Sequence, residues 1–395
     1  MTGPDPKALA GRRAVVVNWR DPWHQRAGGS ERYAWELAKA LRDAGASVEF
    51  WTARDEGQSA RETREGIRLR RRGGEYAFYG GIWARLLGDR VRRRRTDLVV
   101  DMDCGIPSFT PLPAGRRTAI VLFVHHVHQE QFRTAMRRPL SDLGRFLEAR
   151  LMPVVYRRVP TVAVSASTVT ELREQLGWRG VVRVIHNGTD LPEPASAPVP
   201  TPDVERVVAL GRVVPHKRLD LVVRAFARVR ERRPGVTLDL IGTGPELPAV
   251  VAVVEELGLR EVVRVHGFLP EDEKSQVLSS ARVHVCASDA EGWGQVVLEA
   301  AAHGLPTVAR DVPGLRDSVV DGTTGWLLDD PDPPDAGPLV DALALGVDRA
   351  LDRLADAQVR LRVGRECREW ARGFDWGRMH AQVLEQALEA LRRAR

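Results

Sequence analysis

Short apolar runs alternate with amphipathic stretches along nearly the whole chain. The apolar runs are rich in Val, Leu, Ile and Ala, and the stretches between them carry apolar residues at helical spacing. This alternation is typical of β-α-β units, whose parallel strands lie beneath helices on both faces of the sheet. We predict strands at 14–19, 47–52, 98–100, 119–124, 161–164, 181–185, 207–210, 237–241, 262–266, 283–287 and 307–309, and helices between them, among these 30–44, 220–232, 246–256, 272–280 and 295–303.

A proline-rich polar segment at 191–202 divides this pattern into two halves. Proline fixes the backbone and cannot serve a central strand, so the segment is interpreted as a linker. A chain of 395 residues also exceeds one ordinary hydrophobic core. We therefore predict an α/β protein with two Rossmann-like, doubly wound parallel-sheet domains, residues 1–190 and 203–374, that face a cleft. Ligands of such sheets bind at the carboxyl ends of the strands.

Composition narrows the class of protein. A content of 43% hydrophobic and 28% charged residues is that of a soluble globular protein. No apolar run approaches the ~18 residues of a membrane span, and residues 1–13 lack the apolar core of a signal peptide. Cys104, Cys286 and Cys367 lie far apart, which favours a reducing, cytoplasmic compartment. The net charge of +6 comes mostly from arginines that we expect to be scattered, and no nucleic-acid-binding motif accompanies them.

The segment 283–309 carries the most chemical information. It reads as a strand, the loop 288–294, a helix and a second strand. Gly292 and Gly294 allow close approach of the backbone to a ligand, and the first N–H groups of the helix, those of Gln295, Val296 and Val297, form an anion site suited to a diphosphate. Two carboxylates beside such a site need hydroxyl donors, which a sugar and a ribose supply. The two carboxylates belong to Glu291 and Glu299.

A second loop leaves the first strand of the second domain. It contains Arg212 and Lys217, whose positive charges can neutralise a diphosphate leaving group. Alone this pair is weak evidence, because arginine is common throughout the chain. We expect this loop to face the loop with Glu291 at the same edge of the sheet, which makes the two signals support each other.

The first domain contributes glycines and histidines at its predicted strand ends. Gly28 and Gly29 precede a helix and offer a further N-terminal anion site or a plain tight turn. The strand 119–124 ends in His125, His126 and His128, which are placed to bond a sugar hydroxyl or an acceptor. A metal site of His125, His128 and Glu130 is an alternative, but it lacks an obvious further ligand, so we predict no metal.

Together these motifs resemble glycosyltransferase family 4, which has the GT-B fold. The segment from Glu291 to Ala300 is similar to the family's E-x7-E motif, and 184–190, 211–217, 242–246 and 304–306 also resemble family motifs. The segment 374–376 resembles the family's terminal crossing, which implies that a helix at 375–395 packs back on the first domain. The resemblance covers nearly the whole chain.

The resemblance implies a retaining transferase that moves a sugar from a UDP- or GDP-type nucleotide-diphosphate sugar without a metal or other cofactor. Arg212 and Lys217 would hold the diphosphate, and Glu299 would accept from the ribose hydroxyls. Glu291 would contact the transferred sugar, with the backbone of Gly294 and Gln295 assisting. His125 is similar to the family's sugar-contacting histidine, although His126 beside it is an alternative. The stretch 20–27 departs from the family pattern on the acceptor side.

Several alternatives remain at this point. They are a sugar phosphorylase or nucleotide-sugar epimerase on the same fold, a non-catalytic sugar-nucleotide-binding subunit, and an NAD enzyme that uses Gly242 and Gly244. The acceptor could be lipid-linked, a saccharide or a secondary metabolite. One segment, with Tyr76, Phe78, Tyr79, Ile82, Trp83, Leu86 and Leu87 beside Arg85, Arg90 and 92–95, could rest on an anionic bilayer. The alternative is that Ile82, Leu86 and Leu87 pack on the domain's own sheet.

Overall fold

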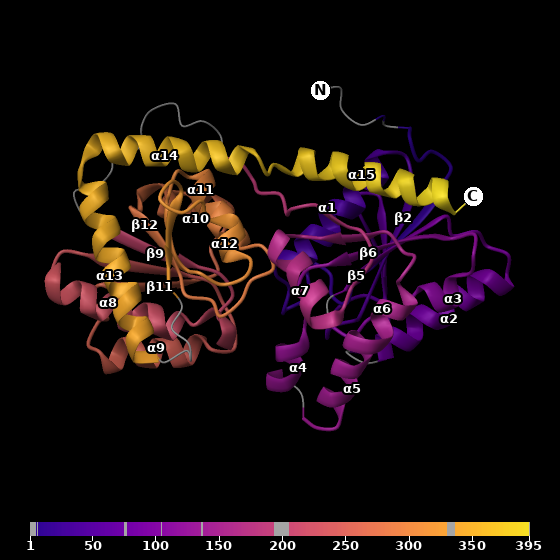
Figure 1. Ribbon diagram of the computed structural model, residues 1–395, viewed down its shortest axis with the longest axis horizontal. Coiled ribbons are helices and arrows are strands. Elements are labelled where there is room, and N and C mark those ends of the chain that lie inside the picture. Colours follow the sequence, from indigo (N-terminus) through magenta and orange to yellow (C-terminus); the bar gives the residue numbers. More distant parts are fainter. Residues whose placement is uncertain are drawn as a thin grey trace. The chain divides into compact units, whose positions relative to one another are not determined.

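The chain forms two compact α/β units (Figure 1). The computed structural model describes residues 5, 7–74, 77–103, 105–135, 137–192, 205–329 and 336–394. The first unit comprises Met1–Gly188 together with Trp376–Arg395, and the second comprises Thr189–Asp375. Most of the expected linker at 191–202 lies outside the described residues.

The first unit is built on an eight-stranded sheet with the order β3-β4-β2-β1-β5-β6-β7-β8. β3 pairs antiparallel with β4, and the other described pairs are parallel. The strands are β1 (Arg13–Val17), β2 (Ser47–Thr52), β3 (Arg61–Arg64), β4 (Ile67–Arg71), β5 (Leu98–Asp103), β6 (Ala119–Val124), β7 (Thr161–Ala163) and β8 (Val182–Val184).

Helices cover both faces of this sheet, because alternate residues of each strand point to opposite sides. In β1, Ala14 and Val16 join the core that lies beneath α1 and α15, whereas Val15 and Val17 join a second core with residues of α2. The helices are α1 (Gly29–Asp43), α2 (Ala77–Val91), α3 (Pro111–Ala114), α4 (Gln129–Ala135), α5 (Leu140–Phe146), a π-helical turn (Leu147–Leu151), α6 (Met152–Val155), α7 (Ala166–Leu176) and α15 (Trp376–Arg393).

The second unit has a six-stranded sheet with the order β11-β10-β9-β12-β13-β14, and its described pairs are parallel. The strands are β9 (Arg206–Leu210), β10 (Thr237–Ile241), β11 (Val263–Gly267), β12 (Val283–Cys286), β13 (Thr307–Arg310) and β14 (Gly325–Leu328). The helices are α8 (Leu219–Arg232), α9 (Leu247–Glu256), α10 (Glu271–Ser280), α11 (Gln295–Ala302), α12 (Leu315–Ser318), α13 (Ala336–Ala355) and α14 (Ala357–Arg372), with a 3-10 turn at Pro215–Lys217. α8 packs against α13, and α11 packs against α14.

Every predicted strand is present within a few residues, and the two α/β sheets are confirmed. Three strands were not predicted: β3, β4 and β14. In β4, buried Ile and Leu alternate with half-exposed arginines, so the strand has no apolar run. β3 is polar throughout, and β14 is only four residues long. Strands of this kind are stabilised by pairing with their neighbours in the sheet, which a local apolar pattern does not reveal.

The segment for which we considered contact with a bilayer forms α2. Phe78, Ile82 and Leu86 are buried against the sheet, but Leu87, which we expected to pack there, is 43% exposed, and Trp83 is 37% exposed. Tyr76 lies outside the described residues. None of the described helices combines the length and the apolar character that crossing a membrane requires.

Candidate functional site

The two predicted site loops of the second unit meet where the strand order of the sheet reverses. From β9 the chain continues outward to β10 and β11, whereas from β12 it continues to β13 and β14 on the other side. β9 and β12 are parallel neighbours, so the loops that follow them start side by side at the carboxyl edge of the sheet. Such a reversal point is where open α/β sheets bind ligands.

Direct contacts join these two loops. Lys217 Nζ donates to Glu291 Oε1, and Ser288 Oγ donates to the same oxygen at 2.8 Å. The backbone N–H of Asp289 donates to the carbonyl oxygen of His216 at 2.8 Å. The prediction that the loop with Lys217 faces the loop with Glu291 is therefore confirmed. Ser288 was not singled out from the sequence, although it lies three residues before Glu291.

Glycine and aromatic packing fix the shape of the loop 287–294. Gly294 has a φ of 75°, and a Cβ added to it would lie 2.4 Å from Ser318 Oγ, so a larger residue cannot replace it without a shift. The ring of Trp293 is buried and lies 5.0 Å from the ring of Phe374. The loop that holds Glu291 is thus anchored at its far end within the second unit.

The amino terminus of α11 supplies fewer donors than predicted. The N–H of Val297 donates to the carbonyl oxygen of Gly294 at 2.9 Å, which forms a tight first turn. Because this N–H group already donates within the protein, the expectation that it faces a ligand is wrong. The N–H groups of Gln295 and Val296 remain the predicted donors of the anion site.

Glu299 lies on α11 and has a cationic neighbour that the sequence did not reveal. Lys274 Nζ on α10 contacts the Glu299 carboxylate at 3.2 Å and the Glu271 carboxylate at 3.0 Å. Burial lowers the pKa of Lys274, but the two carboxylates outweigh this effect and raise the pKa above its usual value. Lys274 is therefore a fixed cation beside the carboxylate that we assigned to hydroxyl binding.

A buried arginine supports the loop 287–294. Arg310 at the end of β13 is 2% exposed. Its guanidinium donates to Asp289 Oδ1 at 2.5 Å and to the carbonyl oxygen of Ala287 at 3.3 Å. Arg218 approaches the same Asp289 carboxylate at 3.5 Å. The loop is thus held by a charged network in addition to its glycines.

The loop 211–217 packs tightly on the glycines of the next loop, 242–246. A Cβ added to Gly242 would lie 1.8 Å from the carbonyl oxygen of Gly211, and one added to Gly244 would lie 2.1 Å from that of Val213. These contacts explain the two glycines by close packing of the backbone. The NAD alternative rested mainly on these glycines, so it loses its main support. Arg212 is half-buried on this loop, directly after Gly211.

In the first unit, a carboxylate of the following helix already binds the predicted Gly28–Gly29 turn. α1 begins at Gly29, and the N–H of Gly28 donates to Glu31 Oε2 at 2.7 Å. Glu31 is buried and pairs with Arg20 at 3.0 Å. Arg20 offsets the negative charge of Glu31, and it belongs to the stretch 20–27 that departs from the family pattern. The anion-binding role of Gly28 and Gly29 stays a prediction.

His125 and His126 have different surroundings, which separates the two candidates. His125 is buried, its ring lies edge-on to Tyr33 at 5.1 Å, and its Nε2 has no hydrogen-bond partner among the described residues. Burial, with a smaller effect of His128, lowers the pKa of His125 to about 3, so the ring is neutral. His126 is half-buried and bonds Gln131 at 3.1 Å. The ring with an unused buried nitrogen is therefore that of His125.

His128 belongs to a buried acidic cluster that the sequence analysis missed. Glu148, in the π-helical turn, accepts from the N–H of His128 at 2.7 Å and contacts its Nδ1 at 3.1 Å. Asp103, at the end of β5, lies beside them, and burial together with Glu148 and Asp101 raises its pKa well above the usual value. The exposed Glu130 instead pairs with Arg133, so the metal set His125, His128 and Glu130 is wrong.

Asp103, His128 and Glu148 are the described residues that could hold a metal ion. Their ligand atoms all lie within 4.8 Å of one another, and all three residues are buried. Glu148 already accepts hydrogen bonds on both oxygens, because Gln129 Nε2 donates to its second oxygen at 2.7 Å. Through these hydrogen bonds the carboxylate of Glu148 holds the histidine loop in place.

Two protein-family models match successive parts of the chain. The model described as Glycosyltransferase Family 4 matches residues 27–193, and the model described as Glycosyl transferases group 1 matches residues 197–352. The first match contains the glycine turn and the histidines, and the second contains both loops of the second unit.

Characterised relatives match about half of the chain. A GDP-mannose-dependent alpha-(1-6)-phosphatidylinositol monomannoside mannosyltransferase of Mycolicibacterium smegmatis is 34% identical over 48% of this chain and 49% of its own length. A D-inositol 3-phosphate glycosyltransferase of Corynebacterium efficiens is 33% identical over 47% and 43%. A glycogen synthase of Mycobacterium tuberculosis is 30% identical over 58% and 54%. The alignments thus span about half the length of these relatives.

Solved structures match over nearly the whole chain. Sucrose-phosphate synthase from Thermosynechococcus elongatus has a TM-score of 0.76 at 22% identity and covers 94% of this chain and 97% of its own. WaaG, a glycosyltransferase involved in lipopolysaccharide biosynthesis, has a TM-score of 0.69 at 17% identity and covers 95% and 98%. These likenesses show the fold alone, which is GT-B. The two family models, which together match residues 27–193 and 197–352, place the chain in glycosyltransferase family 4.

Proposed function

We propose that this chain transfers a sugar from a UDP- or GDP-type nucleotide-diphosphate sugar to a hydroxyl group of an acceptor, with retention at the anomeric carbon. The observation that carries the proposal is the network of Lys217, Ser288 and Glu291 at the reversal point of the second sheet. In a chain of this family, the network places a lysine that would bind phosphate beside a carboxylate that would bind sugar hydroxyl groups.

The ion pair of Lys217 and Glu291 suggests how the donor would be received. In the structure each of the two groups has the other as a partner. A bound donor would offer phosphate oxygens to Lys217 and sugar hydroxyls to Glu291, so both groups would exchange one charged partner for a substrate contact. Arg212 and the first N–H groups of α11 would share the diphosphate charge. Glu299, beside Lys274, would accept from the ribose hydroxyls.

The proposed reaction is a front-face substitution. The bond between the anomeric carbon and the diphosphate oxygen breaks, and the acceptor oxygen forms its bond on the same face. The departing phosphate oxygen takes the acceptor's proton. Lys217 and Arg212 would stabilise the negative charge that develops there, and electrostatic stabilisation of this kind usually contributes most to the rate enhancement of an enzyme. Cationic side chains take this task in the proposal, so the reaction needs no metal.

In the first unit we assign a sugar contact to His125, because its buried ring nitrogen lacks a partner among the described residues. His128 is committed to Glu148, so the acceptor contact is assigned to the half-buried His126. The relatives named above act on phosphatidylinositol mannoside, inositol phosphate or glycogen, according to their names. They support a hydroxyl-rich acceptor, free or lipid-linked.

A panel of nucleotide sugars tests the proposal. The correct donor should raise the melting temperature, because a ligand that binds the folded state stabilises it. With an acceptor, the product should keep the donor's anomeric configuration by NMR coupling constants, and activity should persist in excess chelator. Consumption of donor only with added phosphate would indicate a phosphorylase, and conversion of the donor's sugar alone would indicate an epimerase. An inverted product would contradict the mechanism.

A further inference from the structure

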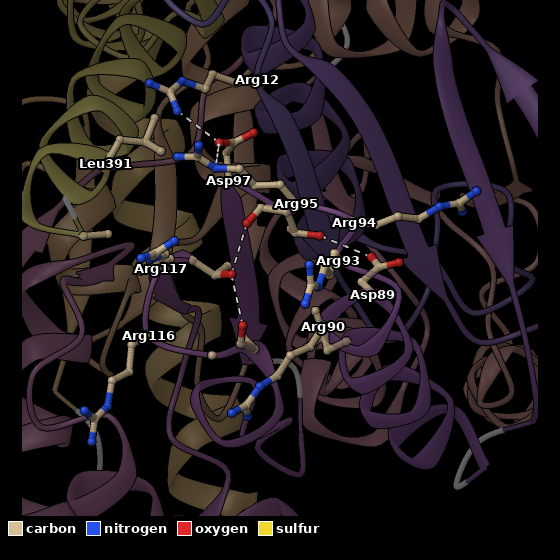
Figure 2. Close-up of a pocket in the computed structure, with 16 residues that line it drawn as sticks. Arg12, Asp89, Arg90, Arg93, Arg94, Arg95, Asp97, Arg116, Arg117 and Leu391 are labelled. Carbon is tan, nitrogen blue, oxygen red and sulfur yellow. Dashed lines mark hydrogen bonds and ion pairs between the residues drawn. The ribbon is translucent and has the colours of Figure 1, made fainter.

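An arginine-lined pocket lies at the amino-terminal edge of the first sheet (Figure 2). It has a volume of about 780 Å³ and is formed by residues that precede β1, β5 and β6, with the end of α2 and of α15. Seven arginines and two aspartates line it. We expected the arginines to be scattered, but seven of them are gathered in this pocket from distant segments: Arg12, Arg90, Arg93, Arg94, Arg95, Arg116 and Arg117.

The two aspartates are already neutralised. Asp97 contacts Arg12 at 3.0 Å and Arg95 at 2.9 Å. Asp89 contacts Arg13, whose side chain comes from β1, at 2.6 Å. Both carboxylates therefore belong to pairs that fix the walls of the pocket, and neither is left to balance the remaining guanidinium groups.

Five arginines of the pocket form no ion pair among the residues that the structure describes. Arg90 and Arg93 lie on one side in Figure 2, and Arg116 and Arg117 lie on the other, with Arg94 next to Arg93 along the chain. Like charges on the walls of one concave pocket repel one another and concentrate a positive potential there. On a convex surface, solvated arginines have no such effect.

This pocket is separate from the proposed sugar-transfer site. The segments that form it precede the strands, whereas Gly28 and His125 follow the strands β1 and β6. A six-residue strand spans roughly 17–20 Å, so the two edges of the sheet are about that far apart. A ligand of the pocket would therefore not be the donor bound for reaction.

We propose that the pocket binds a small anion with at least two phosphate groups. Guanidinium groups match phosphate oxygens with paired, charge-assisted hydrogen bonds, and several from different segments can surround one such ligand. The phosphates could belong to a free polyphosphate-type molecule or to the headgroup of a phosphorylated lipid. Both sources present the same chemistry to the five arginines.

Calorimetry with inorganic tripolyphosphate tests this site at constant ionic strength. The background protein carries Arg212→Ala and Lys217→Ala, so that the proposed donor site does not contribute. Adding Arg90→Gln, Arg93→Gln and Arg117→Gln should weaken binding at least about tenfold, because charge-assisted bonds are lost. The matched control is Arg158→Gln, Arg173→Gln and Arg179→Gln, which removes the same charge from other exposed positions of the first unit.

The control should leave tripolyphosphate binding unchanged. Equal weakening in both triple variants, or no binding in the background protein, would overturn the proposal. Sedimentation with vesicles then separates the two sources of phosphate, a lipid headgroup and a free anion. Vesicles that contain a phosphoinositide are compared with vesicles of phosphatidylcholine alone. If the background protein and the control sediment with the phosphoinositide vesicles and the pocket variant does not, the ligand is the lipid headgroup. Tripolyphosphate binding without vesicle binding would identify the free anion.

Discussion

The loop with Glu291 in the second unit and the histidine loop in the first unit both follow a central strand, yet different interactions hold them. In the second unit the partners of Glu291 come from its own loop and from the loop after the adjacent strand. In the first unit His128 is bonded to Glu148, which lies twenty residues later in a π-helical turn, and Asp103 at the end of β5 lies nearby. The first arrangement follows from strand order, and the second follows from tertiary packing.

This difference separates the groups that we propose to contact the substrate from the groups that support the site. The carboxylate of Glu291 is half-buried and has the ammonium group of a lysine side chain as partner, which suits exchange with a substrate. The carboxylate of Glu148 is fully buried and has the backbone N–H of His128 as a donor. A buried carboxylate with backbone donors fixes a loop, because its removal leaves those donors unsatisfied.

The largest effect is expected for Glu148→Ala. Losing acceptors for His128 and Gln129 should lower the free energy of unfolding by about 2–5 kcal/mol, measured by urea denaturation. The nearby exposed Glu130→Gln should change it by less than about 0.5 kcal/mol. If Glu148→Ala proved as stable as Glu130→Gln, the histidine loop would not depend on this carboxylate.

Glu291→Ala and Glu299→Gln should act on turnover instead. Each loses a charge-assisted bond to a hydroxyl group, so transfer should fall by roughly tenfold to a hundredfold, while urea denaturation should show a folded protein. Glu273→Gln on α10 is an exposed control that should retain activity. Turnover near that of the unaltered protein in both variants would remove these residues from the site.

Arg212→Ala and Lys217→Ala should discriminate between ligands. Binding of the nucleoside diphosphate should weaken by roughly tenfold for each variant, because phosphate charge loses a partner. Binding of the free nucleoside should hardly change. Calorimetry with both ligands measures this, and equal losses for the two would contradict the assignment to the diphosphate.

A further comparison concerns pH and takes one histidine from each unit. His125 and His284 are buried, and burial lowers the pKa of each to about 3 in the folded state. The unfolded chain binds protons first as pH falls below about 6.5, so each histidine should reduce stability by up to about 1.4 kcal/mol per pH unit between 6.5 and 3. Above pH 6.5 this contribution is constant.

Asp103 acts in the opposite direction, because its raised pKa makes the folded state retain a proton. The difference between each variant and the unaltered protein isolates the histidine. His125→Gln and His284→Gln should each flatten the loss of stability from pH 6.5 to 4.5 in chemical denaturation. An unchanged slope in either variant would mean that this ring is already protonated when folded.

The sequence was sufficient for the second-unit loops because their chemistry is local. Strand, glycine loop and helix follow one another from β12 to α11, and adjacency to the loop of Lys217 follows from the order of a doubly wound sheet. The edge strand β3 was missed because it is polar throughout, and its neighbour β4 was missed because arginines interrupt its apolar pattern. Val297 was misassigned because the first turn of α11 is tighter than an ideal helix.

Groups that meet through tertiary packing were not predicted. Lys274 contacts Glu299 from another helix, and Glu148 contacts His128 from a π-helical turn. In neither pair does the distance along the sequence indicate that the two residues meet. The arginine pocket has the same origin, because it collects residues from segments that are separated along the chain. In the sequence these arginines were indistinguishable from the others.

The discontinuous first unit has a consequence for synthesis on the ribosome. α15 supplies Met379, Val383, Leu384 and Ala387 to the core beneath β1, and it packs on α1 and β6 (Figure 1). The second unit is one continuous segment whose ends are joined by a bridge between Thr189 and Asp375. The second unit is therefore fully synthesised before α15 is made. The first unit can complete its hydrophobic core only after that. Until α15 emerges, the nascent first unit exposes an apolar face that chaperones would recognise.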